Sequence, residues 1–177
     1  SSGAVAAGMS SLGYTKRPTD LAELQAVAAI GQTKLIQAYD HEFRRHRHEG
    51  ISAADGSPVT GPFHAAQVLL GADDLQNRVG YLNVRNTLLR LMEYPNVIPV
   101  INENDTVATE ELESRNHRGF SDNDKLSALV MSRLDANLLV LLSDVDGLFT
   151  GNPAHDKSAE WIPEVSRITR QIGRAHV

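Results

Sequence analysis

The sequence has no cysteine and few aromatic residues, which make up 5% of its 177 residues. The first absence excludes a disulfide framework and a zinc site built on thiolates, and it fits a cytoplasmic protein. The second means that the core must consist of Leu, Val, Ile and Ala. No apolar run approaches the roughly 20 residues that span a bilayer, and the net charge of −5 argues against nucleic acid as the main partner. We therefore expect neither a membrane nor a nucleic-acid partner.

Several catalytic and metal-binding motifs are also missing. There is no Walker A motif and no G-x-G-x-x-G, the two patterns that most directly signal a phosphate-binding loop. The seven histidines show no metal-ligand spacing, and the acidic residues around Asp144 lack the rest of an EF-hand loop. Ser1 and Ser2 have no His/Asp pattern that would support a hydrolase triad. The sequence thus predicts no resident metal site.

The pattern along the chain predicts alternating helices and strands. Asp20 is expected to cap a helix with Glu23 at the reciprocal capping-box position, and apolar and small residues then recur at spacings of four and three as far as Phe43. Pro99 lies in a predicted strand and indicates an edge or irregular position. In order, these elements give an α/β domain with a mostly parallel sheet, whose last two strands form a right-handed crossover. The expected helices cover residues 20–43, about 81–94 and 122–134, and the expected strands are 65–70, 97–101 and 138–142.

Three clusters of acids and amides stand beside these elements. Ligands of open α/β sheets bind beyond the carboxyl ends of the strands, which is where the chain places Asn102–Asp105 and Ser143–Gly147. The third cluster, Ser121–Asp124, precedes a helix. Each cluster alone is explained by turn and capping chemistry, but together they offer more carboxylates and amides than capping requires. Side chains of this kind suit an amino-acid-like substrate that is bound through its ammonium group.

Two segments with glycine favour a close approach to a ligand. Gly147 permits a sharp turn after strand 138–142, where Asp144 and Asp146 could contact ribose hydroxyls, or a magnesium ion through water. The small residues of Ser1–Gly8 could open into a helix whose first amides hold an anion. Taken alone, this second pattern does not define a ligand.

Six segments, read in order, resemble the glutamate 5-kinase family of amino acid kinases. They are SSGAVAAG, AAIGQTKLIQAYDHEF, YLNVRNTLLRL, VIPVINENDTVAT, SDNDKLSALV and LLVLLSDVDGLFTGNP. The combination of INEND, DND and SDVDGL distinguishes this family from other amino acid kinases. The resemblance implies a three-layer sandwich of helices around a mostly parallel sheet. It also implies that the parent protein uses ATP and Mg²⁺ to phosphorylate the side-chain carboxylate of L-glutamate, the first step of proline biosynthesis.

The resemblance further implies roles for individual residues. Asp124 resembles the residue that organises the catalytic groups. Ser143 and Asp144 resemble nucleotide contacts, and Gly147 belongs to the same motif. The residues expected to bind glutamate are Ser2, Gly3, Ala4, Asn102, Asp105 and Asn123.

The sequence departs from the family pattern at both ends. In the family, a Lys-containing Gly-rich loop precedes the first of these segments, and a second ATP-binding segment with a Lys follows the last. The sequence has neither, so we expect residues 1–177 to be one incomplete kinase domain with little activity of its own. The stretch Glu113–Phe120 occupies the place of the family's feedback loop and suggests L-proline as an inhibitor, and a homo-oligomer is expected. Two alternatives remain open: another amino acid kinase, such as one acting on acetylglutamate or carbamate, and a regulatory fragment that binds glutamate or proline without catalysis.

Overall fold

The computed structural model divides the chain into two compact units, Ser1–Leu139 and Val140–Val177. Each unit is described by itself. The residues that the structure describes are 1–45, 51–52, 56–71, 74–75, 77–107, 123–142 and 146–167.

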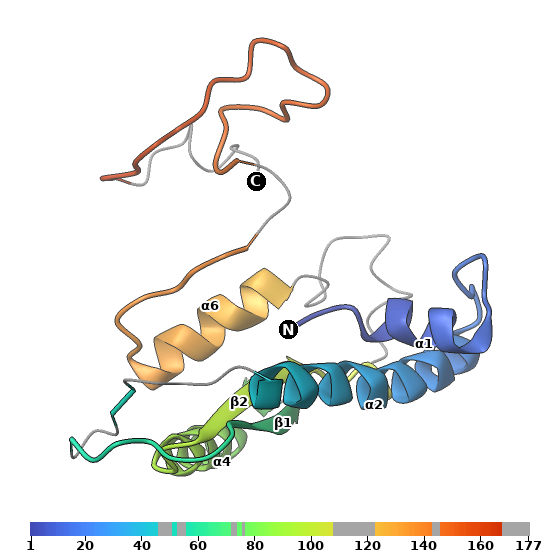
Figure 1. Ribbon diagram of the computed structural model, residues 1–177. Helices are drawn as coiled ribbons and strands as arrows, with labels where there is room; N and C mark the ends of the chain where they lie inside the picture. The colour runs from blue at the N-terminus through green and yellow to red at the C-terminus, as the bar shows by residue number, and fades with distance from the viewer. Residues whose placement is uncertain are drawn as a thin grey trace. The chain divides into compact units, whose positions relative to one another are not determined.

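The first unit begins with two helices packed against each other, α1 (Ala4–Leu12) and α2 (Leu21–Arg45) (Figure 1). The expected start of α2 is confirmed, because the Asp20 carboxylate accepts a hydrogen bond of 2.9 Å from the Glu23 amide. The Glu23 side chain accepts instead from the Tyr14 hydroxyl at 2.6 Å, which ties the α1–α2 connection to the first turn of α2. This hydrogen bond raises the pKa of Tyr14.

The sheet of the first unit consists of two parallel strands, β1 (His64–Leu70) and β2 (Val97–Glu103), joined by helix α4 (Arg78–Met92). Their register runs from His64 opposite Val97 to Leu70 opposite Glu103. The side chain of Asn77 caps α4 by accepting from the Gly80 amide at 2.7 Å. The β-α-β unit that the sequence predicts around residues 97–142 is therefore found one strand earlier in the chain.

The predicted edge character of Pro99 is consistent with this pairing. The Asn104 amide donates to the Leu70 carbonyl across the ladder at 2.9 Å, and backbone groups of successive strand residues point in alternate directions. Pro99 is an odd number of residues from Asn104, so its missing N–H would point away from β1. The proline therefore removes no bond from the ladder.

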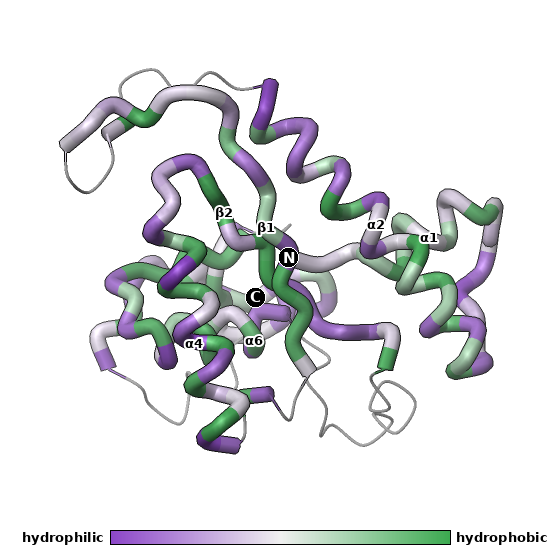
Figure 2. Tube along the Cα trace, turned by 90° about the horizontal axis from the view of Figure 1, so that it is seen from below, coloured by the Kyte–Doolittle hydropathy of each residue, from purple (hydrophilic) through white to green (hydrophobic). Residues whose placement is uncertain are grey.

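Helices cover both faces of this sheet, which gives three layers. Side chains alternate between the faces of a strand, and Leu70 packs with Leu88 of α4 and Leu126 of α6 (Asn123–Leu134) on one face. On the other face, the Gln67 side chain donates to Gln32 of α2 at 3.3 Å. The strands are largely hydrophobic along the chain, whereas α2 alternates hydrophobic and hydrophilic segments (Figure 2). This arrangement is consistent with the expected α/β fold.

The strand expected over residues 138–142 is not formed in the part of the chain that the structure describes. Leu138 and Leu142 are 76% and 93% exposed, and the described sheet contains β1 and β2 alone. A continuous apolar strand is stable when a neighbouring strand pairs with it and layers cover both its faces. Residues 138–142 are hydrophobic enough to form such a strand. No strand among the described residues pairs with them.

The described part of the second unit is a loop, without a helix or an extended strand. A single antiparallel bridge joins Phe149 to Trp161, flanked by hydrogen bonds from Thr150 to the Glu160 carbonyl at 2.9 Å and from Ile162 to the Leu148 carbonyl at 2.7 Å. These bonds bring the two ends of the loop that follows Gly147 together.

Candidate functional site

Asn102 lies near the carboxyl end of β2 and is the most buried polar residue among the predicted substrate residues. It is 3% exposed, and its Oδ1 atom has no hydrogen-bond partner among the described residues. An unsatisfied buried acceptor is costly, so this oxygen favours a ligand that brings a donor. The chain turns directly after it, with the Val107 amide donating to the Asn104 carbonyl at 3.2 Å and the Thr106 hydroxyl donating to Asn104 Oδ1 at 2.5 Å.

The Ser1–Ala4 segment reaches the same end of β2. The Ser1 nitrogen donates to the outward-pointing Ile101 carbonyl at 2.8 Å. Gly3 is the N-cap residue of α1 with φ +98°, and no described side chain caps that helix end. The free first-turn amides, together with the helix dipole, favour a negatively charged group. The structure thus brings Ser2, Gly3 and Ala4 to the strand end that carries Asn102.

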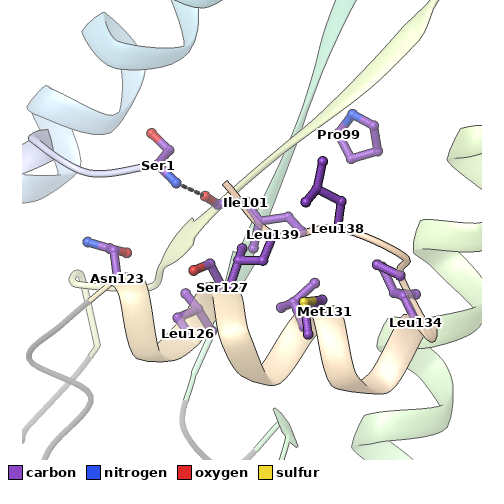
Figure 3. A pocket seen from close by; sticks show the side chains of 12 residues that line it. Ser1, Pro99, Ile101, Asn123, Leu126, Ser127, Met131, Leu134, Leu138 and Leu139 are labelled. Atoms are coloured by element: carbon purple, nitrogen blue, oxygen red, sulfur yellow. Dashed lines mark hydrogen bonds between the residues drawn. The ribbon is translucent and has the colours of Figure 1, made fainter. Parts of the chain in front are cut away.

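A pocket of about 320 Å³ lies beside β2 and α6 in the first unit. Its polar rim includes Ser1 and Asn123, and its walls are apolar residues of the strand and the helix (Figure 3). Asn123 Oδ1 is the second buried side-chain oxygen without a partner among the described residues. This places a second unsatisfied acceptor at the first residue of α6. The lining residues are Ser1, Pro99, Ile101, Asn123, Leu126, Ser127, Val130, Met131, Leu134, Ala136, Leu138 and Leu139.

Asp124 follows Asn123 in the first turn of α6 and is close enough to act electrostatically on Ser1. Burial lowers the pKa of the Ser1 amino group, while the negative charge of Asp124 raises it. The carboxylate predicted to organise catalysis therefore shares its surroundings with the segment predicted to bind substrate.

Gln32 of α2 is a site residue that sequence reasoning missed. It is 5% exposed, and its Nε2 atom donates to the Glu103 carbonyl at 3.2 Å and to Asp105 Oδ2 at 3.4 Å. Asp105, the predicted ligand of the substrate ammonium group, is thus held by a buried amide on α2. The sequence does contain a sign of this role. Gln32 lies eight positions after Leu24, on the buried stripe of α2, where polar residues are uncommon.

The predicted nucleotide residues are described only in part. Ser143 and Asp144 lie outside the described residues. Gly147 lies in the second unit with φ +135°, and a Cβ atom added there would be 3.0 Å from Trp161 Nε1. This backbone strongly favours glycine, as expected for a sharp turn.

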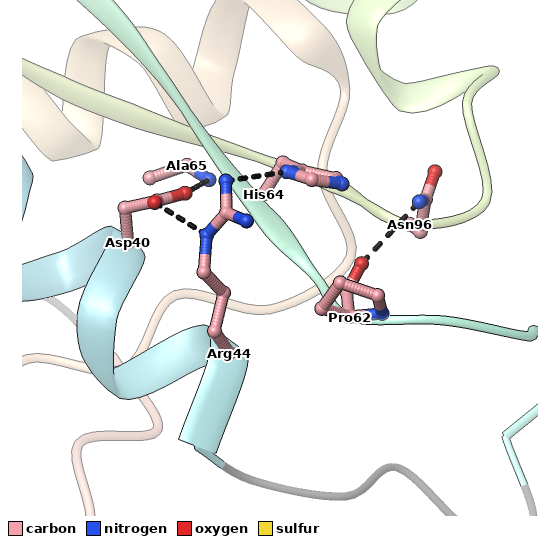
Figure 4. Close-up of polar contacts among 6 residues, drawn as sticks. All are labelled: Asp40, Arg44, Pro62, His64, Ala65 and Asn96. Atoms are coloured by element: carbon pink, nitrogen blue, oxygen red, sulfur yellow. Dashed lines mark hydrogen bonds and ion pairs between the residues drawn. The ribbon is translucent and has the colours of Figure 1, made fainter.

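A further polar cluster lies at the opposite, amino end of β1 (Figure 4). Asp40 accepts from Arg44 Nε at 2.6 Å and from the Ala65 amide at 3.3 Å, and Arg44 also contacts His64 Nδ1 at 3.1 Å. The hydrogen bond from Arg44 is the main cause of the lowered pKa of Asp40. These contacts fasten α2 to β1.

Comparison with known proteins identifies the family of this chain. The sequence profile of the Amino acid kinase family matches residues 1–170. The chain belongs to the amino acid kinase family. Among curated relatives, the glutamate 5-kinases of Nitrosococcus oceani and Ectopseudomonas mendocina are 48% and 49% identical over 94% and 93% of the chain, and that of Myxococcus xanthus is 46% identical over 97%. The chain spans 38% to 40% of the length of these relatives.

In this amino acid kinase chain, two features of the described residues bear on metal binding and on membrane crossing. The described residues contain no group of three or more His, Cys, Asp or Glu side chains placed to hold a metal. None of the described helices is both long and apolar enough to cross a membrane. The contacts in the structure include those of Ser1 with the Ile101 carbonyl and of Asp105 with Gln32, and the pocket beside α6 adds Asn123.

Proposed function

We propose that this chain is the substrate-binding part of a glutamate 5-kinase, which transfers the γ-phosphoryl group of ATP to the side-chain carboxylate of L-glutamate in the first step of proline biosynthesis. The observation that carries the proposal is the pair of buried, unsatisfied oxygens of Asn102 and Asn123. Ligand donors would satisfy both oxygens, and the ammonium group of an amino acid supplies three.

We assign the roles as follows. Asp105 binds the substrate ammonium group by charge, and Asn102 and Asn123 accept hydrogen bonds from it. The Ser2 hydroxyl and the amides of Gly3 and Ala4 hold a substrate carboxylate at the start of α1. The residue that organises the transfer is Asp124.

The chemistry needs alignment more than it needs a base. The γ-carboxyl of free glutamate is ionised near neutral pH, since an unperturbed Glu side chain has a pKa of about 4.3. Repulsion between this carboxylate and the phosphates opposes attack, so positioning and charge neutralisation supply most of the catalysis.

We infer that the nucleotide contacts come from Ser143, Asp144 and Gly147. Mg²⁺ would enter with ATP, because it is commonly held by substrate phosphates and one or two carboxylates. That mode of binding fits a chain without a cluster of three acidic ligands in its described residues. Asp124 is the carboxylate of this site best placed to assist it.

We further propose a cytoplasmic homo-oligomer that L-proline inhibits at the glutamate site. Proline has the same α-carboxylate and a charged amino group, so it can use the ligands assigned to that part of glutamate. The segment Glu113–Phe120, where a feedback loop is expected, lies outside the described residues.

The test uses the full-length protein that carries this chain. It is incubated with ATP, Mg²⁺ and a panel of L-glutamate, N-acetylglutamate, L-aspartate and carbamate, and acyl phosphate is trapped with hydroxylamine. We expect product from L-glutamate alone and competition by L-proline. Product from another acceptor would replace the assignment, and calorimetric binding of glutamate without any turnover would indicate a regulatory role.

A further inference from the structure

The Gln32 side chain is buried at 5% exposure, and its polar atoms meet neighbours on both sides. Nε2 faces the Glu103 carbonyl and the Asp105 carboxylate at 3.2 and 3.4 Å, and Oε1 accepts from Gln67 Nε2 at 3.3 Å. This forms a relay in which Gln67 donates to Gln32 and Gln32 donates to Asp105.

The orientation of the Gln32 amide is fixed by chemistry. A backbone carbonyl can only accept a hydrogen bond, and an ionised carboxylate likewise. The end of the amide that faces Glu103 and Asp105 must therefore be the NH₂ group. A rotation of the amide by 180° would place Oε1 against two acceptors and leave them without this donor.

We propose that Gln32 is a positioning residue for substrate recognition, and that it sets the place of the Asp105 carboxylate through the orientation of its amide. This inference rests on the proposed function, in which Asp105 binds the ammonium group of glutamate. Gln32 itself does not touch the reacting atoms, so its loss should affect the KM for glutamate more than kcat.

Gln67 offers a way to disturb the amide without altering the buried core. It is exposed on β1, so substitution there perturbs folding less than substitution at Gln32. In Gln67→Glu the neighbour becomes an acceptor, so Gln32 Oε1 loses its donor and faces a negative charge, which displaces the amide and weakens its hydrogen bonds to Glu103 and Asp105. In Gln67→Met that donor is lost but no acceptor is added, so the Glu103 carbonyl keeps the amide in its original orientation.

The experiment compares four variants of the full-length protein with the wild type: Gln67→Glu, Gln67→Met, Gln32→Glu and Gln37→Glu. Gln37 is exposed on the same helix, so Gln37→Glu controls for the added charge. Steady-state kinetics give kcat and the KM for glutamate at several pH values. Selective ¹⁵N labelling of glutamine reports the Gln32 side-chain NH₂ resonances, which are assigned by their disappearance in Gln32→Glu.

We expect Gln67→Glu to raise the KM for glutamate about tenfold, the size of effect expected when a hydrogen bond to a charged group is lost, with kcat within about twofold. The Gln32 resonances should shift in this variant, while Gln67→Met and Gln37→Glu behave as the wild type. In Gln32→Glu, KM should rise further as pH increases, because the introduced carboxyl can donate to Asp105 only while it is protonated.

Two results would overturn the relay. One is an unchanged KM and unchanged Gln32 resonances in Gln67→Glu, and the other is an equal increase in KM in Gln67→Glu and Gln67→Met. A wild-type protein with no glutamate-dependent turnover would instead refute the proposed function. In that case the NH₂ resonances of Gln32 in Gln67→Glu would still show whether Gln67 controls the position of the Gln32 amide.

Discussion

Replacement of Gly31 by alanine tests whether close packing of α1 on α2 positions the substrate site. A methyl group at residue 31 would lie 1.7 Å from the Ala4 carbonyl oxygen and 2.7 Å from the Gly8 nitrogen. Ordinary van der Waals contact begins at 3.4 Å, which is twice the distance from the added methyl group to the Ala4 oxygen. The start of α1 would therefore have to move away from α2 by about half of that contact distance. Both clashing atoms, the Ala4 oxygen and the Gly8 nitrogen, belong to the backbone. Rotation of a side chain therefore cannot relieve the clash.

Two effects of this substitution have opposite signs. Alanine in a helix interior is favoured over glycine by about 1 kcal/mol, whereas overpacking in a well-packed core costs about 1–3 kcal/mol and occasionally more. A displacement of this size exceeds what core repacking usually absorbs. We therefore expect the cost to lie at or above the upper end of that range, so that Gly31→Ala lowers the free energy of unfolding by about 2 kcal/mol or more.

The same displacement carries Gly3 and Ala4 away from the substrate. A misplacement of about 1 Å can cost on the order of 100-fold in rate, so kcat/KM for glutamate should fall more than stability alone explains. Chemical denaturation and steady-state kinetics on the full-length protein measure the two effects. Thr33→Ala, an exposed position on the same helix, serves as the control and should change neither by much.

The reasoning would be refuted by a Gly31→Ala protein that is more stable than the wild type and binds glutamate normally. Helix propensity would then have outweighed the clash, and the close contact would not be what positions the start of α1.

Three further predictions concern single side chains. Asn102→Leu should leave the free protein as stable or more so, because it removes a buried unsatisfied oxygen, yet it should raise the KM for glutamate, and loss of stability with unchanged KM would contradict this. Asp40 has a lowered pKa in the folded protein, so its contribution to stability is present above its unfolded pKa and disappears as pH falls through the folded value. Asp40→Asn should accordingly flatten the pH dependence of thermal unfolding in the acid range, whereas an unchanged profile would show that its ion pair is inert. Trp161 is the only tryptophan of the chain and is 59% exposed next to Gly147, so ATP-Mg²⁺ should change its fluorescence, and no change at saturating nucleotide would remove Gly147 from the nucleotide site.

Helices α2, α4 and α6 could be predicted from the sequence because their signals are local. The cap at Asp20 and the apolar stripe of α2 lie within the helix itself, and Pro95 follows the end of α4 closely. The expected strand at Leu138–Leu142 was wrong for the opposite reason. Strand formation needs a partner from elsewhere in the chain, and a run of hydrophobic residues does not say whether one is present.

The candidate site was predictable in its residue types but not in its contacts. Asn102 and Asn123 stood out because amides after a strand or before a helix exceed what capping needs. Gln32 did not stand out, because α2 also carries Gln25 and Gln37 and its sequence alone does not show which glutamine meets a partner on another element. Only the three-dimensional packing shows that its amide faces Glu103 and Asp105 from the other side of the sheet.

The alternation of β2 connects the core to the candidate site. Ile101 packs with the core residues beneath α4 and α6, while its carbonyl accepts from Ser1. The next side chain, Asn102, points to the opposite face, where α2 contributes Gln32. A shift of the strand register by one residue would exchange these two side chains, placing the amide in the hydrophobic core and the isoleucine at the substrate site. The hydrophobic burial that fixes the register of β2 is therefore also what holds Asn102 and Asp105 in place, so core variants at Val68, the partner of Ile101 in the ladder, should impair glutamate binding although Val68 does not line the pocket.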